Sequence, residues 1–90
     1  MKIKIAIIGS GRMGLRHALA YQKIKNVEVV GFSDTDQKKA KLLSKRFHNN
    51  HFKFENVFEN KTIDAIDICT PNALHAQHSI SAMKSGKHVI

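Results

Sequence analysis

The sequence has few of the residues that build disulfide scaffolds or membrane spans. Among its 90 residues one is cysteine, one is proline and none is tryptophan. The single cysteine, Cys69, excludes an internal disulfide, which fits a reducing compartment. No apolar run approaches the ~20 residues that cross a bilayer, and the apolar stretch near the start leads directly into a glycine turn. We therefore expect a cytoplasmic protein with no membrane partner.

Negative charge is also scarce, but the excess of positive charge is not concentrated anywhere. Fifteen Lys and Arg against seven Asp and Glu give a formal net charge of +8. Such an excess can favour nucleic acid. The lysines are spread along the chain without interleaved aromatics or zinc-ligand spacing, which is typical of solvated helix faces. We expect no nucleic-acid partner; a nucleic-acid-binding domain remains an alternative, and its affinity would fall steeply with salt.

The hydrophobic pattern alternates between strand and helix periods along the whole chain. It predicts strands over 2–8, 27–32, 52–54 and 63–69, a fifth strand beginning at 88, helices over 12–24, 36–47 and 73–85, and one helical turn within 55–62. Asp36 is a predicted helix N-cap and Gly86 a predicted helix stop. This order predicts an α/β fold, a doubly wound parallel sheet of Rossmann type with helices on both faces.

A glycine-rich turn lies between the first predicted strand and the first predicted helix. Its residues are Gly9, Ser10, Gly11, Arg12, Met13 and Gly14. An acid, Asp34, follows 20 residues beyond Gly14, at the end of the second predicted strand. The G-x-G-x-x-G spacing is a weak signal alone, but a preceding strand, a following helix and this acid together form the dinucleotide-binding fingerprint.

Each position of the turn has a physical reason. Gly9 allows a tight turn out of the strand, Gly11 lets a pyrophosphate approach the backbone, and Gly14 lets the helix pack closely on the sheet. The free N–H groups of the first helical turn, including those of Arg12 and Met13, then face the phosphates with the helix dipole behind them. The turn therefore predicts a dinucleotide cofactor.

Asp34 distinguishes between the two nicotinamide cofactors. Its carboxylate can accept hydrogen bonds from the hydroxyls of the adenine ribose, and its charge repels a 2′-phosphate. This favours NAD over NADP as cofactor. Lys38 and Lys39 are close enough in sequence to weaken that preference.

Thr70-Pro71-Asn72 ends the fourth predicted strand, whose carboxyl end faces the ligand crevice in this fold. Thr70 and Asn72 are therefore candidates for contacts on the nicotinamide side, with turn formation and helix capping as the alternative role. His75 and His78 are spaced like metal ligands, but without a second ligand pair we expect no metal site. We assign no catalytic residue, because no nucleophile or paired-acid pattern is present.

Three stretches resemble the glucose–fructose oxidoreductase / inositol dehydrogenase (Gfo/Idh/MocA) family. They are residues 9–17, residues 70–75 and residues 82–89, and the last is the most specific. The resemblance spans residues 3–90 and implies an NAD(P)-dependent oxidoreductase acting on sugars, polyols or their derivatives. It places the glycines of the turn with Arg12 and Met13 around the pyrophosphate, Asp34 at the adenine ribose, and Thr70, Asn72 and His75 near the nicotinamide.

The chain departs from the family in what it lacks. In the family a catalytic Glu-Lys-Pro motif follows the His88-Val89 region, and a C-terminal substrate domain comes after it; neither is in these 90 residues. We therefore expect a partial Rossmann domain, 1–90, with an open sheet edge. Such a chain would be marginally stable or would associate, for example as a homo-oligomer. The same pattern also allows a non-catalytic or truncated dinucleotide-binding module, or a Rossmann domain that binds a methyl donor.

Overall fold

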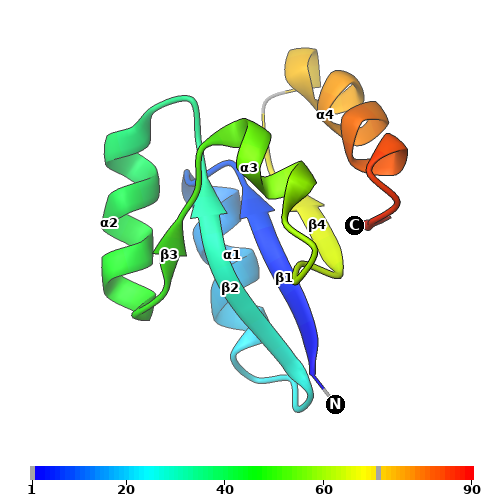
Figure 1. Cartoon of the computed structure of the whole chain (residues 1–90). Coiled ribbons are helices and arrows are strands. Elements are labelled where there is room, and N and C mark those ends of the chain that lie inside the picture. Colours follow the sequence, from blue (N-terminus) through cyan, green and yellow to red (C-terminus); the bar gives the residue numbers. More distant parts are fainter. Residues whose placement is uncertain (1, 71) are drawn as a thin grey trace.

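The chain folds into one parallel sheet with helices on both faces (Figure 1). The computed structural model describes residues 2–70 and 72–90, with the backbone alone for 72–75. The elements in chain order are β1 (Ile3–Ile8), α1 (Arg12–Tyr21), β2 (Val27–Ser33), α2 (Gln37–Phe47), β3 (Asn50–His51), α3 (Phe54–Glu59), β4 (Ala65–Ile68), α4 (Asn72–Lys84) and β5 (His88–Val89). The sheet order β3-β2-β1-β4-β5 confirms the predicted Rossmann-type fold.

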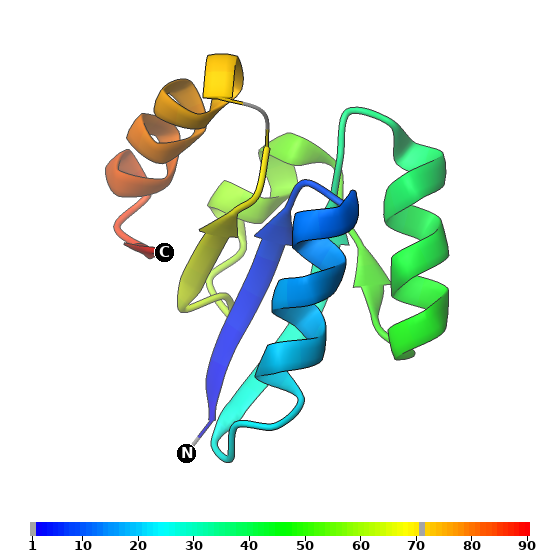
Figure 2. The ribbon, with the colours of Figure 1, turned by 180° about the vertical axis from the view of Figure 1, so that it is seen from behind.

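Strand β1 is the centre of the sheet, and its side chains alternate between two cores. Ile5 and Ile7 pack with Ala18 of α1 and Ala40 of α2 on one face. Ala6 and Ile8 pack on the other face with residues of α3 and α4. Figures 1 and 2 show α1 and α3 on opposite sides of the sheet. The period of two in β1 therefore becomes two apolar layers.

Two local signals bound helices where the sequence predicts, one at the start of α2 and one at the end of α4. The Asp36 side chain accepts a hydrogen bond from the Lys38 N–H and caps α2. Gly86 has a φ of +80°, the left-handed conformation that ends α4. The first helix is shorter than predicted. After Tyr21 the N–H groups of Lys23 and Ile24 bond to carbonyl groups three residues earlier, and Asn26 then adopts a left-handed conformation with a φ of +70°.

The predicted third strand, 52–54, is wrong by two residues. Strand β3 is Asn50–His51, which pairs with Gly31 and Phe32, and Phe54 is already the first residue of α3. The alternation of Phe52 and Phe54 imitates a strand. The spacing that matters is helical, since Phe54 packs on Phe58 one turn later with ring centroids 5.3 Å apart.

Strand β4 is also shorter than predicted, and α4 presents an unexpected face. Among the side chains of α4 that the structure describes, Ala82 and His78 are buried, whereas Ile80 and Met83 are 50% and 61% exposed. The spacing of Ala76, Ile80 and Met83 in the sequence predicts that they form the buried face of this helix, but all three are exposed. Among the described residues, no helix is long and apolar enough to cross a membrane.

Candidate functional site

The carboxyl ends of β1, β2 and β4 enclose a cavity at one edge of the sheet. Its volume is about 480 Å³. Seven of the lining residues come from the glycine turn and from the loop after β2, and Lys39, Cys69 and Thr70 complete it; the full set is Gly9, Gly11, Arg12, Met13, Asp34, Thr35, Asp36, Lys39, Cys69 and Thr70. Sequence segments far apart in the chain thus meet at the crevice where this fold binds ligands.

The glycine turn fits tightly into the structure at its two ends. Gly9 has a φ of +100°, and a side chain there would lie 2.6 Å from the carbonyl oxygen of Cys69. A side chain at Gly14 would overlap the carbonyl oxygen of Gly9. Both positions therefore require glycine, Gly9 for its backbone conformation and its closeness to the end of β4, and Gly14 for the close approach of α1 to the turn.

Gly11 differs, because its surroundings are open. A Cβ atom at Gly11 would meet nothing within 4 Å, and the residue lines the cavity. Gly11 is also the N-cap of α1, with no side chain capping the helix. The N–H groups of Arg12, Met13 and Gly14 have no intrahelical partner at this position. Open space and free amides at a helix start fit a phosphate group.

Ser10 has a different place from the other residues of the turn. Its N–H donates to the Asp34 carboxylate at 2.6 Å, and its buried hydroxyl lies 3.4 Å from the carbonyl oxygen of Ser33. It is not among the residues that line the cavity. The assignment of Ser10 to the cofactor stays a prediction, and the contacts observed are those of a residue that links the turn to β2.

Asp34 is held in place by the backbone around it. Its two carboxylate oxygens accept from the N–H groups of Ser10 and Asp36, at 2.6 and 2.8 Å. A carboxylate has about four acceptor positions, so acceptors remain toward the cavity. Asp34 and Thr35 also line a second cavity of about 500 Å³, which includes Phe54 and His78.

Of the three residues predicted to lie near the nicotinamide, Thr70 is the one whose side chain the structure describes. It lines the first cavity, and its hydroxyl oxygen lies 3.1 Å from Nδ1 of His78. Asn72 begins α4, but the side chains of Asn72 and His75 lie outside the described residues. Their assigned contacts on the nicotinamide side stay predictions. The ring of His78 also contacts Phe54, with centroids 4.3 Å apart.

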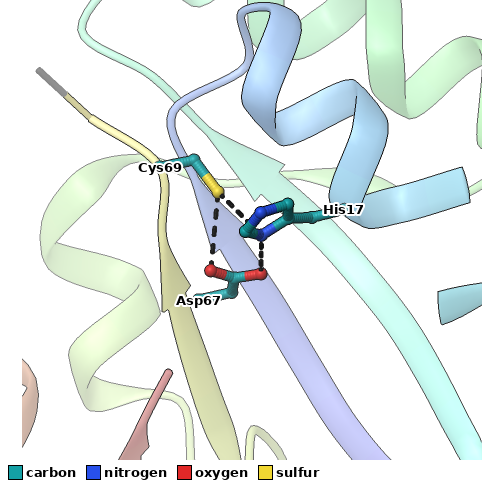
Figure 3. A group of neighbouring side chains, drawn as sticks. All are labelled: His17, Asp67 and Cys69. Atoms are coloured by element: carbon teal, nitrogen blue, oxygen red, sulfur yellow. Dashed lines mark hydrogen bonds and ion pairs between the residues drawn. The ribbon is translucent and has the colours of Figure 1, made fainter. Parts of the chain in front are cut away.

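A buried polar cluster next to this cavity was not predicted. Asp67 on β4 is 1% exposed, and its Oδ2 atom accepts hydrogen bonds from Nδ1 of His17 and from the Tyr21 hydroxyl, both at 2.6 Å. Figure 3 shows Cys69 beside the same carboxylate. The sequence suggested a packing or surface role for His17, and a spacing of 50 residues gives no signal for its pairing with Asp67.

Burial and the neighbouring carboxylate keep two members of this cluster, the Cys69 thiol and the Tyr21 hydroxyl, protonated. Burial, followed by the charge and hydrogen bond of Asp67, raises the pKa of the Cys69 thiol to about 12. Burial and the hydrogen bond to Asp67 also raise the pKa of the Tyr21 hydroxyl above its ordinary range. Cys69 is thus a neutral thiol at neutral pH rather than a reactive nucleophile.

The sheet order, the glycine turn on a helix start and the fixed acid after β2 define an NAD(P)-binding Rossmann domain. The sequence matches the family model described as "Oxidoreductase family, NAD-binding Rossmann fold" over residues 3–90. The chain belongs to this family, the Gfo/Idh/MocA oxidoreductases, and the resemblance read from the sequence is confirmed.

Individual relatives agree with this membership. The chain is 40% identical over 90 residues to glucose-6-phosphate 3-dehydrogenase of Bacillus subtilis (strain 168), covering 97% of this chain and 25% of that protein. An NAD-binding protein from Listeria innocua superposes with a TM-score of 0.91 at 32% identity, over 99% of this chain and 26% of the other. The WlbA dehydrogenase from Bordetella pertussis, solved with NADH and UDP-GlcNAcA, superposes at 0.90 and 25% identity, over 99% and 28%. The chain thus spans about a quarter of the length of these relatives.

Proposed function

We propose that this chain binds NAD as the cofactor-binding part of an oxidoreductase that acts on a sugar, a polyol or a derivative. The observation that carries the proposal is Asp34, which two backbone N–H groups hold at the cavity beside the open space of Gly11. When bound, the cofactor would supply hydride transfer, and the protein would supply binding and orientation. The sugar class is supported by the relative named glucose-6-phosphate 3-dehydrogenase.

The proposed binding residues form two groups, one for the pyrophosphate and one for the adenine ribose. The free amides at the start of α1 would hold the pyrophosphate, and the Asp34 carboxylate would accept from the adenine ribose. Asp34 also borders the second cavity with Phe54, so a ribose on Asp34 would direct the adenine ring toward that aromatic side chain. Competition by AMP for the NAD site tests this placement.

The preference for NAD over NADP depends on opposing charges at one cavity. A 2′-phosphate would meet the Asp34 carboxylate, but Lys39 also lines this cavity. We propose that Asp34 dominates, because the backbone donors fix its carboxylate at the strand end. None of the 90 residues is assigned a catalytic role, and the Glu-Lys-Pro motif of the family is not among them.

Calorimetric titration of the chain with NAD and with NADP tests the proposal. We expect tighter binding of NAD, and a loss of about ten- to hundredfold in NAD affinity for Asp34→Ala, the range of a hydrogen bond to a charged group. Asp64→Ala is the matched control, since Asp64 accepts from the Lys4 N–H at the opposite edge of the sheet. Equal loss in both variants, or NADP bound more tightly than NAD, would contradict the proposal.

A further inference from the structure

The cluster on the α1 side of β4 carries metal-ligating groups of three kinds. Nδ1 of His17 lies 2.6 Å from Oδ2 of Asp67, and Sγ of Cys69 lies 3.3 Å from that nitrogen and 3.4 Å from Oδ1 of Asp67. Figure 3 shows the three side chains pointing toward one another. Within the described residues they form a group whose ligand atoms all lie within 4.8 Å of one another.

The fold brings these groups together for simple geometric reasons. Asp67 and Cys69 are two residues apart at the end of β4, so they share the sheet face that α1 covers. His17 lies in α1 and reaches down to that face. Asp67 is almost fully buried, while Cys69 lines the cavity. The cluster is therefore held rigidly on one side and accessible from the cavity on the other.

The distances between the ligand atoms are close to those of a tetrahedral zinc site. Zinc bonds of about 2.0–2.3 Å to nitrogen, oxygen and sulfur give ligand separations of about 3.3–3.7 Å. The two separations that involve Cys69 already have these values within a few tenths of an ångström. The His17–Asp67 pair at 2.6 Å would have to open by about 0.7 Å, which side-chain rotation can supply.

We propose that His17, Asp67 and Cys69 form a binding site for a borderline-soft divalent cation of the zinc type. Three protein ligands with one open position is the arrangement of many zinc sites. On binding, the Cys69 thiol loses its proton to solvent, and the His17 proton is carried on Nε2 so that Nδ1 faces the metal. The cation also relieves the repulsion between thiolate and carboxylate, and the Tyr21 hydroxyl supports Asp67 from outside.

This site does not depend on dinucleotide binding, so it can be tested separately. Titration of the unaltered chain with Co²⁺, followed by absorption, reports ligand type. Because the chain has one cysteine, a thiolate-to-cobalt charge-transfer band can arise from Cys69 alone. We expect that band together with intense tetrahedral visible bands, both removed by competing Zn²⁺ and unaffected by Mg²⁺.

Variants separate the site from adventitious binding to the other histidines. Cys69→Ser should remove the charge-transfer band, and His17→Gln should weaken Co²⁺ binding about tenfold or more. The control is His51→Gln, an exposed histidine on β3, which should behave as the unaltered chain. Zn²⁺ should also raise the melting temperature of the unaltered chain.

Two results would overturn the proposal. One is the absence of a sulfur-to-cobalt band in the folded, unaltered chain, with folding checked by circular dichroism. The other is a band that His17→Gln leaves unchanged or that His51→Gln reduces equally. If a variant fails to fold, the Co²⁺ spectrum and the Zn²⁺-dependent melting shift of the unaltered chain still decide the question.

Discussion

Each of the two strands that flank β1 is associated with an aspartate, Asp34 directly after β2 and Asp67 within β4, but the two are fixed by different means. Asp34, after β2, is held by backbone N–H groups of its own loop and of the glycine turn. Asp67, within β4, is held by side chains of α1, His17 and Tyr21. The first arrangement leaves a carboxylate facing a cavity; the second uses a buried carboxylate to fasten a helix to a strand.

The difference indicates which of the two aspartates can reach a dinucleotide in the cavity. Backbone donors hold Asp34 without covering it, so its remaining acceptors face outward. The partners of Asp67 come from a helix that covers it, and only 1% of the residue is exposed. We therefore expect Asp67 to matter mainly for stability and Asp34 mainly for cofactor affinity.

A substitution in the glycine turn, which follows the central strand β1, should have the largest effect on stability. Gly14→Ala places a methyl group against the carbonyl oxygen of Gly9, a backbone atom that cannot move cheaply. We expect a loss of about 3 kcal/mol or more in the free energy of unfolding, measured by urea denaturation and circular dichroism. Gly11→Ala, with open space around it, should cost about 1 kcal/mol or less. Similar losses for both would mean that the close contact at Gly14 is not what constrains the turn.

Removal of the buried carboxylate should be the next largest effect. Asp67→Ala leaves the donors of His17 and Tyr21 without their acceptor. We expect a loss of about 3 kcal/mol in the free energy of unfolding, as for a broken buried pair. Asp34→Ala should cost about 1 kcal/mol, because its hydrogen bond from the Asp36 N–H is exposed and the one from the Ser10 N–H is only partly buried. The same denaturation measurement checks both, and a greater loss for Asp34→Ala would reverse the comparison.

The cap of α2, two residues after Asp34, tests how much a purely local contact contributes to the free energy of unfolding. Asp36→Ala removes the side-chain acceptor of the Lys38 N–H. The expected loss is about 1 kcal/mol of the free energy of unfolding. Asp36→Ser retains a capping oxygen and should restore most of the stability. Equal stability of the alanine and serine variants would show that the cap contributes little here.

The smallest effect is expected on the far side of β4, on the exposed face of α4. Met83→Gln replaces a side chain that is 61% exposed. In this chain the free energy of unfolding should change by about 0.5 kcal/mol or less. Ala82→Gln, at a fully buried neighbour, should destabilise far more. A large loss for Met83→Gln in thermal melting would mean that this face is covered in solution.

The sequence predicted the features that depend on contacts between residues close together in the chain. The glycine turn, Asp34 and the cap at Asp36 follow from the steric and hydrogen-bonding needs of a few adjacent residues, so their spacing alone locates them. The parallel sheet with helices on both faces follows from the alternation of strands and helices. These features include most of what defines the cofactor cavity.

The remaining features depend on contacts that spacing does not show. The phenylalanines near residue 53 fit a strand or a helix, and only their packing selects α3. Ile80 and Met83 lie on the exposed face of α4, because Ala82 and His78 are the buried ones among the side chains of this helix that the structure describes. The pairing of His17 with Asp67 spans 50 residues and appears only when α1 is placed on β4.

The central position of β1 has a consequence for the order in which the chain folds. Its pairing with β2 closes a loop of about two dozen residues, whereas its pairing with β4 joins Ile5 to Ala65, sixty residues later. Loop closure of the shorter kind is entropically cheaper, so β1, α1 and β2 should assemble first. During synthesis, β1 has no partner on its β4 side and His17 has no Asp67 to bond until β4 leaves the ribosome. The first half of the domain would meanwhile depend on chaperones or on speed of synthesis to avoid mispairing.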